Sequence, residues 1–265
     1  MAIKLIACDL DGTLLNYDGQ ISDRTKEIIK KAQEKGTKFC IATGRMFRSA
    51  CQFAKILDIK CPVISYNGAL IKDFVTDEIL YSLPLDISIA QKVLLYCKKN
   101  NWYVQKYEDD FLYVESMTGY AQRYAQKVSV PVKAQGDAFY ELKQPPNKLM
   151  LVVDETKQQD ILRELRVFFG EDIFITTSNN RFIEIINPGV NKGTALAYLC
   201  RSLNIEKDQV MALGDSFNDI EMLEYAGLAV AMGNAAPELK AVSNFISLDN
   251  HNDGVAAAIE EHVLK

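Results

Sequence analysis

Residues 5–15 read Leu-Ile-Ala-Cys-Asp-Leu-Asp-Gly-Thr-Leu-Leu, an apolar run that is interrupted by two carboxylates. The run Ile3–Cys8 predicts a buried β-strand, and Asp9 and Asp11 follow it directly. Residues i and i+2 of an extended chain point to the same side, so both carboxylates are expected to face one point beyond the strand. Two negative charges that close repel each other, and a divalent cation is the usual remedy.

Taken alone, this segment has other interpretations. A turn rich in acidic residues would have the same composition. A calcium-binding EF-hand loop also begins with alternating acids, but its twelfth position needs a glutamate and is Gln20 here. The EF-hand interpretation therefore fails, whereas the turn stays open.

Strands and helices alternate at both ends of the chain. In the N-terminal part, where Ser22 is a candidate N-cap, the spacing predicts helix, strand, helix and strand at Ser22–Lys35, Lys38–Ala42, Phe47–Leu57 and Pro62–Ser65. In the C-terminal part it predicts the same order at Lys192–Leu203, Val210–Leu213, Ile220–Tyr225 and Leu228–Met232. This alternation indicates an α/β fold, a Rossmann-like core with a parallel sheet, which binds ligands at the carboxyl ends of its strands.

The pattern changes between Pro84 and Pro188. Hairpins and helices are mixed there, for example a helix at Ile87–Asn100 followed by two strands around Glu108–Asp110. Such mixing is typical of an α+β module. We therefore predict a core domain made of residues 1–83 and 188–265, with residues 84–187 inserted as an α+β domain and prolines near both junctions.

The composition is that of an ordinary globular protein, with 48% apolar residues and a formal charge of −5. The acidic balance argues against nucleic acid or an anionic membrane as the main partner. The apolar N-terminal run contains two carboxylates, so we expect no signal peptide, and no stretch has the length of a membrane span. The six cysteines lie scattered without CxxC spacing, which indicates reduced thiols in a cytoplasmic protein.

Thr43-Gly44-Arg45 follows the predicted strand that ends at Ala42. A hydroxyl group and an unhindered glycine N–H at a strand end suit phosphate oxygens. The alternative is a plain turn between strand and helix, with Thr43 as N-cap. Arg45, and Asn67 after the next predicted strand, are expected to contact the ligand or to brace the inserted domain, and a purely structural role is the alternative.

Lys192 stands at the beginning of a predicted helix. A lysine there opposes the helix macrodipole, so a nearby anion would explain it, and a solvated lysine is the alternative. The segment is not a phosphate-binding P-loop, because no Gly-Lys-Ser/Thr follows a glycine at the required spacing.

The segment Gly-Asp-Ser-Phe-Asn-Asp at 214–219 follows the predicted strand Val210–Leu213 and adds Asp215, Asn218 and Asp219 to the same sheet edge. In isolation, a turn rich in Asp, Asn and Ser explains it equally well. Together, however, the four segments place carboxylates, a hydroxyl group and a lysine on successive strand ends of one predicted sheet. Chance rarely produces that coincidence.

The sequence resembles the haloacid dehalogenase superfamily, whose four motifs it matches in order: DLDGTLL, ATGR, a lysine before glycine, and GDSFND. More narrowly, it resembles the Cof-type members, whose large cap lies between the second and third motifs. The resemblance implies a phosphatase in which Asp9 attacks phosphorus and forms an aspartyl-phosphate. Asp11 would protonate the leaving alcohol and then activate water, and an acid at that position suits rapid hydrolysis of the intermediate.

The resemblance also implies Mg²⁺ as cofactor. The metal is expected to be held by Asp9, the backbone carbonyl of Asp11 and Asp215. Asp219 fits either a metal ligand or an acid that supports the ligands.

A second set of residues is expected to bind the substrate. By the resemblance, Thr43 and Lys192 hold the transferred phosphoryl oxygens, with Gly44 and Asn218 assisting. The inserted domain would act as a cap that closes over the site, excludes water and selects the leaving group. The expected substrates are small phosphorylated metabolites, above all sugar phosphates.

Two other functions stay open. A phosphomutase of the same superfamily would share the core and a similar cap, but would reorient a bisphosphorylated intermediate. A non-catalytic sensor of phosphorylated ligands would be expected to have lost one of the motif acids, and none is missing. The sequence also leaves open whether the chain is a monomer or a homodimer.

Overall fold

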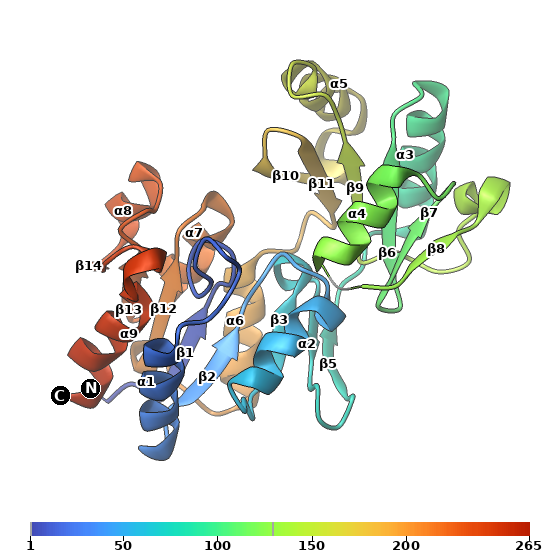
Figure 1. The fold of residues 1–265 in the computed structure, drawn as a ribbon. Helices are drawn as coiled ribbons and strands as arrows, with labels where there is room; N and C mark the ends of the chain where they lie inside the picture. The colour runs from blue at the N-terminus through green and yellow to red at the C-terminus, as the bar shows by residue number, and fades with distance from the viewer. Residues whose placement is uncertain (1, 129) are drawn as a thin grey trace. The chain divides into compact units, whose positions relative to one another are not determined.

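The chain folds into two compact units. The computed structural model describes residues 2–128 and 130–265. One unit, the core unit, combines the residues up to Tyr81 with Asn191–Lys265, and the other, the inserted unit, is Ser82–Val190. The core unit contains a parallel sheet and the inserted unit an additional, mainly antiparallel sheet, so the predicted fold class is confirmed (Figure 1).

The sheet of the core unit has five parallel strands in the order β14-β13-β12-β1-β2. The strands are β1 (Leu5–Cys8), β2 (Lys38–Ile41), β12 (Val210–Gly214), β13 (Leu228–Ala231) and β14 (Phe245–Ile246). Cys8, the last residue of β1, pairs with Ile41 on one side and with Leu213 on the other. The segments that follow β1, β2 and β12 therefore leave the sheet at one edge.

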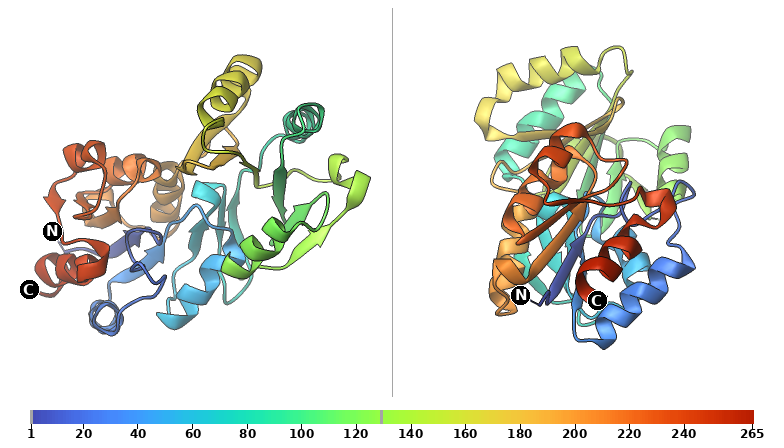
Figure 2. Two further views of the ribbon diagram at one scale, coloured as in Figure 1. Left: turned by 45° about the horizontal axis from the view of Figure 1, so that its top comes forward. Right: turned by 90° about the vertical axis from the view of Figure 1, so that its left-hand side faces the viewer.

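Both faces of this sheet are covered, which explains its apolar strands. All four residues of β1 are completely buried, as expected for a parallel sheet with helices on its faces. The helices are α1 (Asp23–Glu34), α2 (Phe47–Ile56), α6 (Lys192–Ser202), α7 (Ile220–Tyr225), α8 (Pro237–Val242) and α9 (Gly254–Ile259). α1 packs beside α9, and α6 beside α7 (Figure 2). No helix in residues 2–128 and 130–265 is long and apolar enough to cross a membrane.

The beginning of α1 shows why these helices form where the sequence predicts. Ser22 is the N-cap, and its hydroxyl oxygen accepts a hydrogen bond of 3.0 Å from the Thr25 N–H. That bond satisfies one of the free N–H groups of the first turn. Ile28, Ile29 and Ala32 then form a buried stripe at helical spacing.

The strand predicted at Pro62–Ser65 does not continue the parallel sheet. β3 (Val63–Ser65) instead pairs antiparallel with β4 (Leu70–Lys72), which neighbours β5 (Ile79–Ser82) in a separate three-stranded sheet. A single bridge, Ala42 to Ile64, links β3 to the end of β2. The chain reverses immediately after β3, because Tyr66 and Asn67 adopt positive φ angles of 52° and 58°.

The inserted unit is built on a six-stranded sheet in the order β10-β11-β9-β6-β7-β8. Its strands are β6 (Val104–Glu108), β7 (Phe111–Val114), β8 (Val132–Ala134), β9 (Lys148–Val152), β10 (Phe174–Asn179) and β11 (Phe182–Ile186). Its helices are α3 (Ile87–Lys99), α4 (Gly119–Val128) and α5 (Gln158–Phe169). Only β7 and β8 run parallel, so this is the α+β arrangement that the mixed sequence pattern predicts.

The two faces of this second sheet differ in chemistry. One face is mainly apolar and packs against α3 and α5, with Leu149, Leu151 and Ile183 in its centre, although the buried Lys106 also lies on it. The opposite face carries polar side chains at alternate positions that are nevertheless buried: Gln105, Tyr107, Lys148 and Glu184. α4 lies over this polar face, where the hydroxyl groups of Tyr107 and Tyr124 are 3.1 Å apart.

Candidate active site

Lys192 is the centre of a buried cluster of charges at the edge of the core sheet. Its Nζ donates hydrogen bonds of 2.6 Å to Asp9 Oδ1 and of 2.6 Å to Asp219 Oδ1. The side chain is completely buried, so the interpretation as a solvated lysine is wrong. Asn191, the N-cap of α6, accepts a bond of 2.7 Å from the Thr194 N–H and thereby fixes the helix start that carries the lysine.

Three carboxylates surround this one ammonium group. Asp9, Asp215 and Asp219 each offer an oxygen within 4.8 Å of the others, although Asp9 and Asp219 lie far apart in sequence. The sequence segments predicted to converge therefore do so. Three negative charges against one positive charge leave two negative charges without compensation.

Burial makes this imbalance unfavourable. It raises the pKa of Asp9 well above the ordinary value, against the opposing effect of Lys192 and with the help of the charges of Asp219 and Asp215. Burial and the charge of Asp219 likewise raise the pKa of Asp215 to about 6. Burial alone would lower the pKa of Lys192, but its attraction to Asp219 and Asp9 outweighs this and raises it. The lysine is therefore charged, and the carboxylates are stabilised by any additional cation.

Both oxygens of Asp219 are already engaged. Oδ1 accepts from Lys192, and Oδ2 accepts from the backbone N–H groups of Asp215 at 3.1 Å and Ser216 at 3.0 Å. The short 3₁₀ helix Phe217–Asp219 brings the side chain back onto its own turn. Asp219 thus fixes both the lysine and the segment that carries Asp215.

The loop after β1 packs directly on Asp215. Thr13 Oγ1 donates a hydrogen bond of 2.9 Å to Asp215 Oδ1. Gly12 has a φ of +83°, and a Cβ atom there would lie 2.3 Å from Asp215 Oδ2, so no larger residue fits. This close approach brings the backbone of Asp11 and Gly12 to the carboxylate cluster.

The donor set fits a small divalent cation. Oxygen ligands at about 2.1 Å from Mg²⁺ lie at most about 4.2 Å from each other, close to the observed spacing of the carboxylates. In the described part of the chain the backbone carbonyl of Asp11 has no hydrogen-bond donor, so it is available as a further oxygen ligand. The two uncompensated negative charges match the charge of such an ion.

Arg45 makes a two-pronged ion pair with Asp11. Its Nε lies 2.7 Å from Asp11 Oδ2, its second guanidinium nitrogen lies 2.6 Å from Oδ1, and the group stacks over Phe53 at 5.1 Å. Thr43, which is buried, orients the same segment, because its Oγ1 accepts from the Arg45 N–H at 3.1 Å. Thr43 is not an N-cap, since the N-cap of α2 is Met46.

Asn67 and Asn218 meet beside Gly44. Asn218 Nδ2 donates a hydrogen bond of 2.9 Å to Asn67 Oδ1. A Cβ atom on Gly44 would lie 2.8 Å from that same oxygen, so the three predicted residues pack as one group. Tyr66 and Asn67 keep left-handed backbone angles, which are costly for a bulky residue such as tyrosine and are typical of functional sites.

The sequence over residues 6–259 matches the family of haloacid dehalogenase-like hydrolases. The chain belongs to this family. It is 34% identical to the 5-amino-6-(5-phospho-D-ribitylamino)uracil phosphatase YcsE of Bacillus subtilis, over 99% of this chain and 96% of that protein. It is 33% identical to the Bacillus subtilis phosphatase of the same description, YwtE, with 98% of both chains covered.

Solved structures of this family agree with the fold. A haloacid dehalogenase-like hydrolase from Bacteroides thetaiotaomicron superimposes with a TM-score of 0.90 and 30% identity, over 98% of this chain and 99% of that one. The Thermotoga maritima protein TM0651 gives 0.88 and 30%, over 98% and 97%. The predicted family and the predicted enzyme class, a phosphoric monoester hydrolase, are confirmed.

Sequence reasoning missed two residues of this haloacid dehalogenase-like site. Thr13, which bonds Asp215, lies inside the first motif and could have been found by its hydroxyl group next to Asp11 and Gly12. Asn234 follows β13, and its Nδ2 donates a bond of 2.8 Å to the Gly12 carbonyl. The rule that polar residues matter at the carboxyl ends of parallel strands would have identified Asn234.

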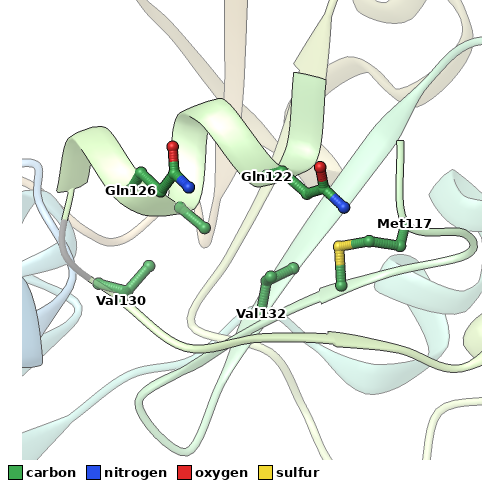
Figure 3. A pocket seen from close by; sticks show the side chains of 6 residues that line it. Met117, Gln122, Gln126, Val130 and Val132 are labelled. Carbon is green, nitrogen blue, oxygen red and sulfur yellow. The ribbon is translucent and has the colours of Figure 1, made fainter. Parts of the chain in front are cut away.

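A pocket of about 340 Å³ lies in the inserted unit and has a different character (Figure 3). It lies between α4 and the strand β8. Its lining consists of apolar side chains and two amides: Met117, Gln122, Ala125, Gln126, Val130 and Val132. None of these residues carries a charge, so the pocket offers no group that would neutralise a phosphate ester.

Proposed function

We propose that this hydrolase is a Mg²⁺-dependent phosphatase that cleaves small phosphorylated metabolites through an aspartyl-phosphate on Asp9. The observation that carries the proposal is the buried junction in which Lys192 bonds both Asp9 and Asp219, with Asp215 close by. A nucleophilic carboxylate, a fixed ammonium group and an excess of negative charge at one strand edge are what phosphoryl transfer with a metal requires.

Mg²⁺ would be held by Asp9, Asp215 and the backbone carbonyl of Asp11. When bound, it would neutralise the carboxylates and the phosphate so that an anionic nucleophile can approach an anionic ester. Asp219 would not be a ligand, because Lys192 and two backbone N–H groups already use both of its oxygens. Its role would be to orient Lys192 and the turn that carries Asp215.

Asp9 would attack phosphorus with the oxygen that does not face Lys192. The bond from phosphorus to the ester oxygen breaks as the new bond to Asp9 forms, and the alcohol leaves. Lys192 would remain fixed by its two carboxylates and bind a non-bridging phosphoryl oxygen.

Asp11 would supply the proton to the leaving alcohol and then take one from the water that hydrolyses the intermediate. Its carboxylate is more than half exposed, so it is accessible to both the leaving group and water. The ion pair with Arg45 holds it in one orientation beside the site. The main role of Arg45 would therefore be to orient Asp11, and not to contact the substrate.

Thr43, Gly44 and Asn218 would bind the remaining phosphoryl oxygens. Thr43 follows β2 at the same edge as Asp9, and the hydrogen bond between Asn218 and Asn67 holds the amide at that edge. Asn67 would thus support Asn218 while fitting its own side chain against Gly44.

The inserted unit would act as the cap domain that selects the leaving group, since the roles proposed for the core residues concern the phosphoryl group and the ester oxygen and leave the rest of the substrate unassigned. For the substrate we propose a phosphate monoester of a sugar or sugar alcohol. The supporting observation is that two relatives at 34% and 33% identity are named for a substrate with a phosphorylated ribityl chain.

The test is a screen of phosphorylated metabolites that includes sugar phosphates and 5-amino-6-(5-phospho-D-ribitylamino)uracil. We expect release of inorganic phosphate that requires Mg²⁺ and that Asp9→Asn abolishes without unfolding the protein. A sugar 1-phosphate converted into its 6-phosphate isomer would instead reveal a phosphomutase. Full activity in Asp9→Asn would refute the assignment of the nucleophile.

A further inference from the structure

Two asparagine side chains anchor the loop that follows β1. Asn234 Nδ2 donates a hydrogen bond of 2.8 Å to the Gly12 carbonyl, and Asn250 Nδ2 donates one of 2.7 Å to the Leu15 carbonyl. The two asparagines are joined, because Asn234 Oδ1 accepts from the Asn250 N–H at 3.0 Å. We call this arrangement the amide clamp, consisting of Asn234 and Asn250.

The orientation of the Asn234 amide follows from its partners. Its oxygen faces an N–H group, which can only donate, and its nitrogen faces a carbonyl, which can only accept. A flipped amide would lose both bonds. Asn234 lies three residues beyond the end of β13 at Ala231, whereas Asn250 lies in the 3₁₀ helix Asn250–Asn252. The clamp therefore connects the loop after β1 to two other segments of the core unit.

The clamp acts on the part of the loop that carries Asp11. The carbonyls of Asp9 and Leu10 are bonded within the loop itself, to the N–H groups of Leu14 at 3.2 Å and of Leu15 at 2.9 Å. Those of Gly12 and Leu15 are bonded by the clamp. Within residues 2–128 and 130–265, the Asp11 carbonyl in the middle of this loop has no donor.

We infer that Asn234 and Asn250 are positioning residues, which fix the loop on the C-terminal side of the Asp11 carbonyl, while the loop's own bonds fix the N-terminal side, so that this oxygen is presented to Mg²⁺. The inference rests on the proposed function, in which that carbonyl is a metal ligand. Gly12 has a φ of +83° and no side chain, so its own conformational preference does not fix the adjoining peptide. The hydrogen bond from Asn234 supplies the missing constraint.

The inference distinguishes metal binding from catalysis. Removal of the Asn234 amide leaves Asp9, Asp215 and Lys192 in place, so the chemical step should survive once the metal is bound. Asn234→Ala removes two hydrogen bonds, of which the one to the Gly12 carbonyl acts next to the metal ligand, and the loss of that bond corresponds to an affinity change of about 3- to 10-fold. Asn234 is exposed, so its replacement by alanine creates no cavity in the core.

The experiment measures Mg²⁺ binding by isothermal titration calorimetry, without substrate, for the wild-type protein and Asn234→Ala. In parallel, hydrolysis of p-nitrophenyl phosphate is followed as a function of Mg²⁺ concentration. The matched control is Asn100→Ala, which removes an amide that donates a 3.0 Å bond to the Tyr96 carbonyl in the inserted unit.

We expect Asn234→Ala to weaken Mg²⁺ binding about 3- to 10-fold and to recover wild-type kcat at saturating Mg²⁺, with no change in Asn100→Ala. Wild-type Mg²⁺ affinity in Asn234→Ala would overturn the role of the clamp, and so would a kcat that saturating Mg²⁺ does not restore. If the wild-type protein itself neither binds Mg²⁺ nor releases phosphate, the proposed function fails as well. The two failures are therefore distinguishable.

Discussion

Both units of the chain contain buried lysines, and two of these, Lys148 and Lys192, have different surroundings. In the inserted unit, Lys148 lies 3.0 Å from Glu184, one positive charge beside one negative charge. In the core unit, Lys192 bonds two carboxylates and has a third close by. The Lys148–Glu184 pair itself carries no net charge, whereas the cluster around Lys192 carries two more negative charges than positive ones.

This difference separates a structural ion pair from a site that needs a ligand. In a buried pair of opposite charges each group compensates the other within the protein, so that removal of one partner is costly although the pair as a whole adds little stability. A buried cluster with excess negative charge is stabilised by binding a cation. The pKa values of Asp9 and Asp215 are raised by burial, which means that these carboxylates bind a proton more readily than usual when no metal cation is bound. Burial of a lysine is therefore a weaker sign of function than the charge balance around it.

The largest expected effect comes from removal of the core lysine. Lys192→Met should lower kcat for p-nitrophenyl phosphate by about 1000-fold, because it removes both a phosphoryl contact and the group that orients Asp9. Steady-state kinetics at saturating Mg²⁺ measure the effect, and circular dichroism verifies the fold. A folded variant with nearly normal kcat would show that the two lysines do not differ as described.

The same substitution in the inserted unit should act on stability instead. Lys148→Met removes the ammonium group that lies 3.0 Å from the buried Glu184 carboxylate and should destabilise the protein by about 3–5 kcal/mol in urea unfolding. The double variant Lys148→Met/Glu184→Leu removes both charges and should regain most of that loss. If Lys148→Met lowers kcat as strongly as Lys192→Met while leaving stability unchanged, Lys148 belongs to the catalytic machinery.

A smaller effect should follow from loosening Asp11. Arg45→Met removes the two-pronged ion pair but no metal ligand, so kcat should fall about tenfold, the lower end for a charged hydrogen bond at a partly exposed group. The Mg²⁺ affinity should stay the same. A changed Mg²⁺ affinity with normal kcat would place Arg45 in the metal site instead.

The smallest effect concerns pH. The folded pKa of Asp215 is about 6, above the ordinary value of 3.8, so the metal-free fold gains a proton on acidification before the unfolded chain does. Protons and Mg²⁺ compete for this carboxylate, and protonation of Asp215 alone should lower the apparent Mg²⁺ affinity about fourfold between pH 7 and pH 5.5, to which the raised pKa of Asp9 adds in the same direction. Titration calorimetry at both pH values measures this, and an affinity that rises on acidification would contradict it.

The sequence was sufficient to predict the fold class, the strand ends and the residues that converge on them, because these follow from local patterns. Asp9, Lys192 and Asp215 each stand at an element boundary that apolar periodicity reveals. The separate sheet of β3 could not be predicted, since it depends on the left-handed Tyr66 and Asn67. A non-glycine residue gives little advance sign of such an angle.

Side-chain partners were the harder part of the site to predict. Arg45 was expected at a ligand or as a brace, yet it binds Asp11, a pairing across the chain that no local pattern encodes. Asn234 was missed because its segment lacks the carboxylates that drew attention to the other strand ends. Hydrogen-bond pairing between distant segments depends on three-dimensional packing.

The central claim is that the excess negative charge around Lys192 binds a cation for phosphoryl transfer to Asp9. It is tested most directly by trapping the aspartyl-phosphate on Asp9. Asp11→Asn should slow its hydrolysis, so the variant is mixed with Mg²⁺ and acetyl phosphate, quenched, reduced with borohydride and analysed by peptide mass spectrometry. We predict that the peptide containing residue 9 carries homoserine in place of Asp9. An unmodified Asp9 peptide, with wild-type enzyme turning over acetyl phosphate under the same conditions, would contradict the account.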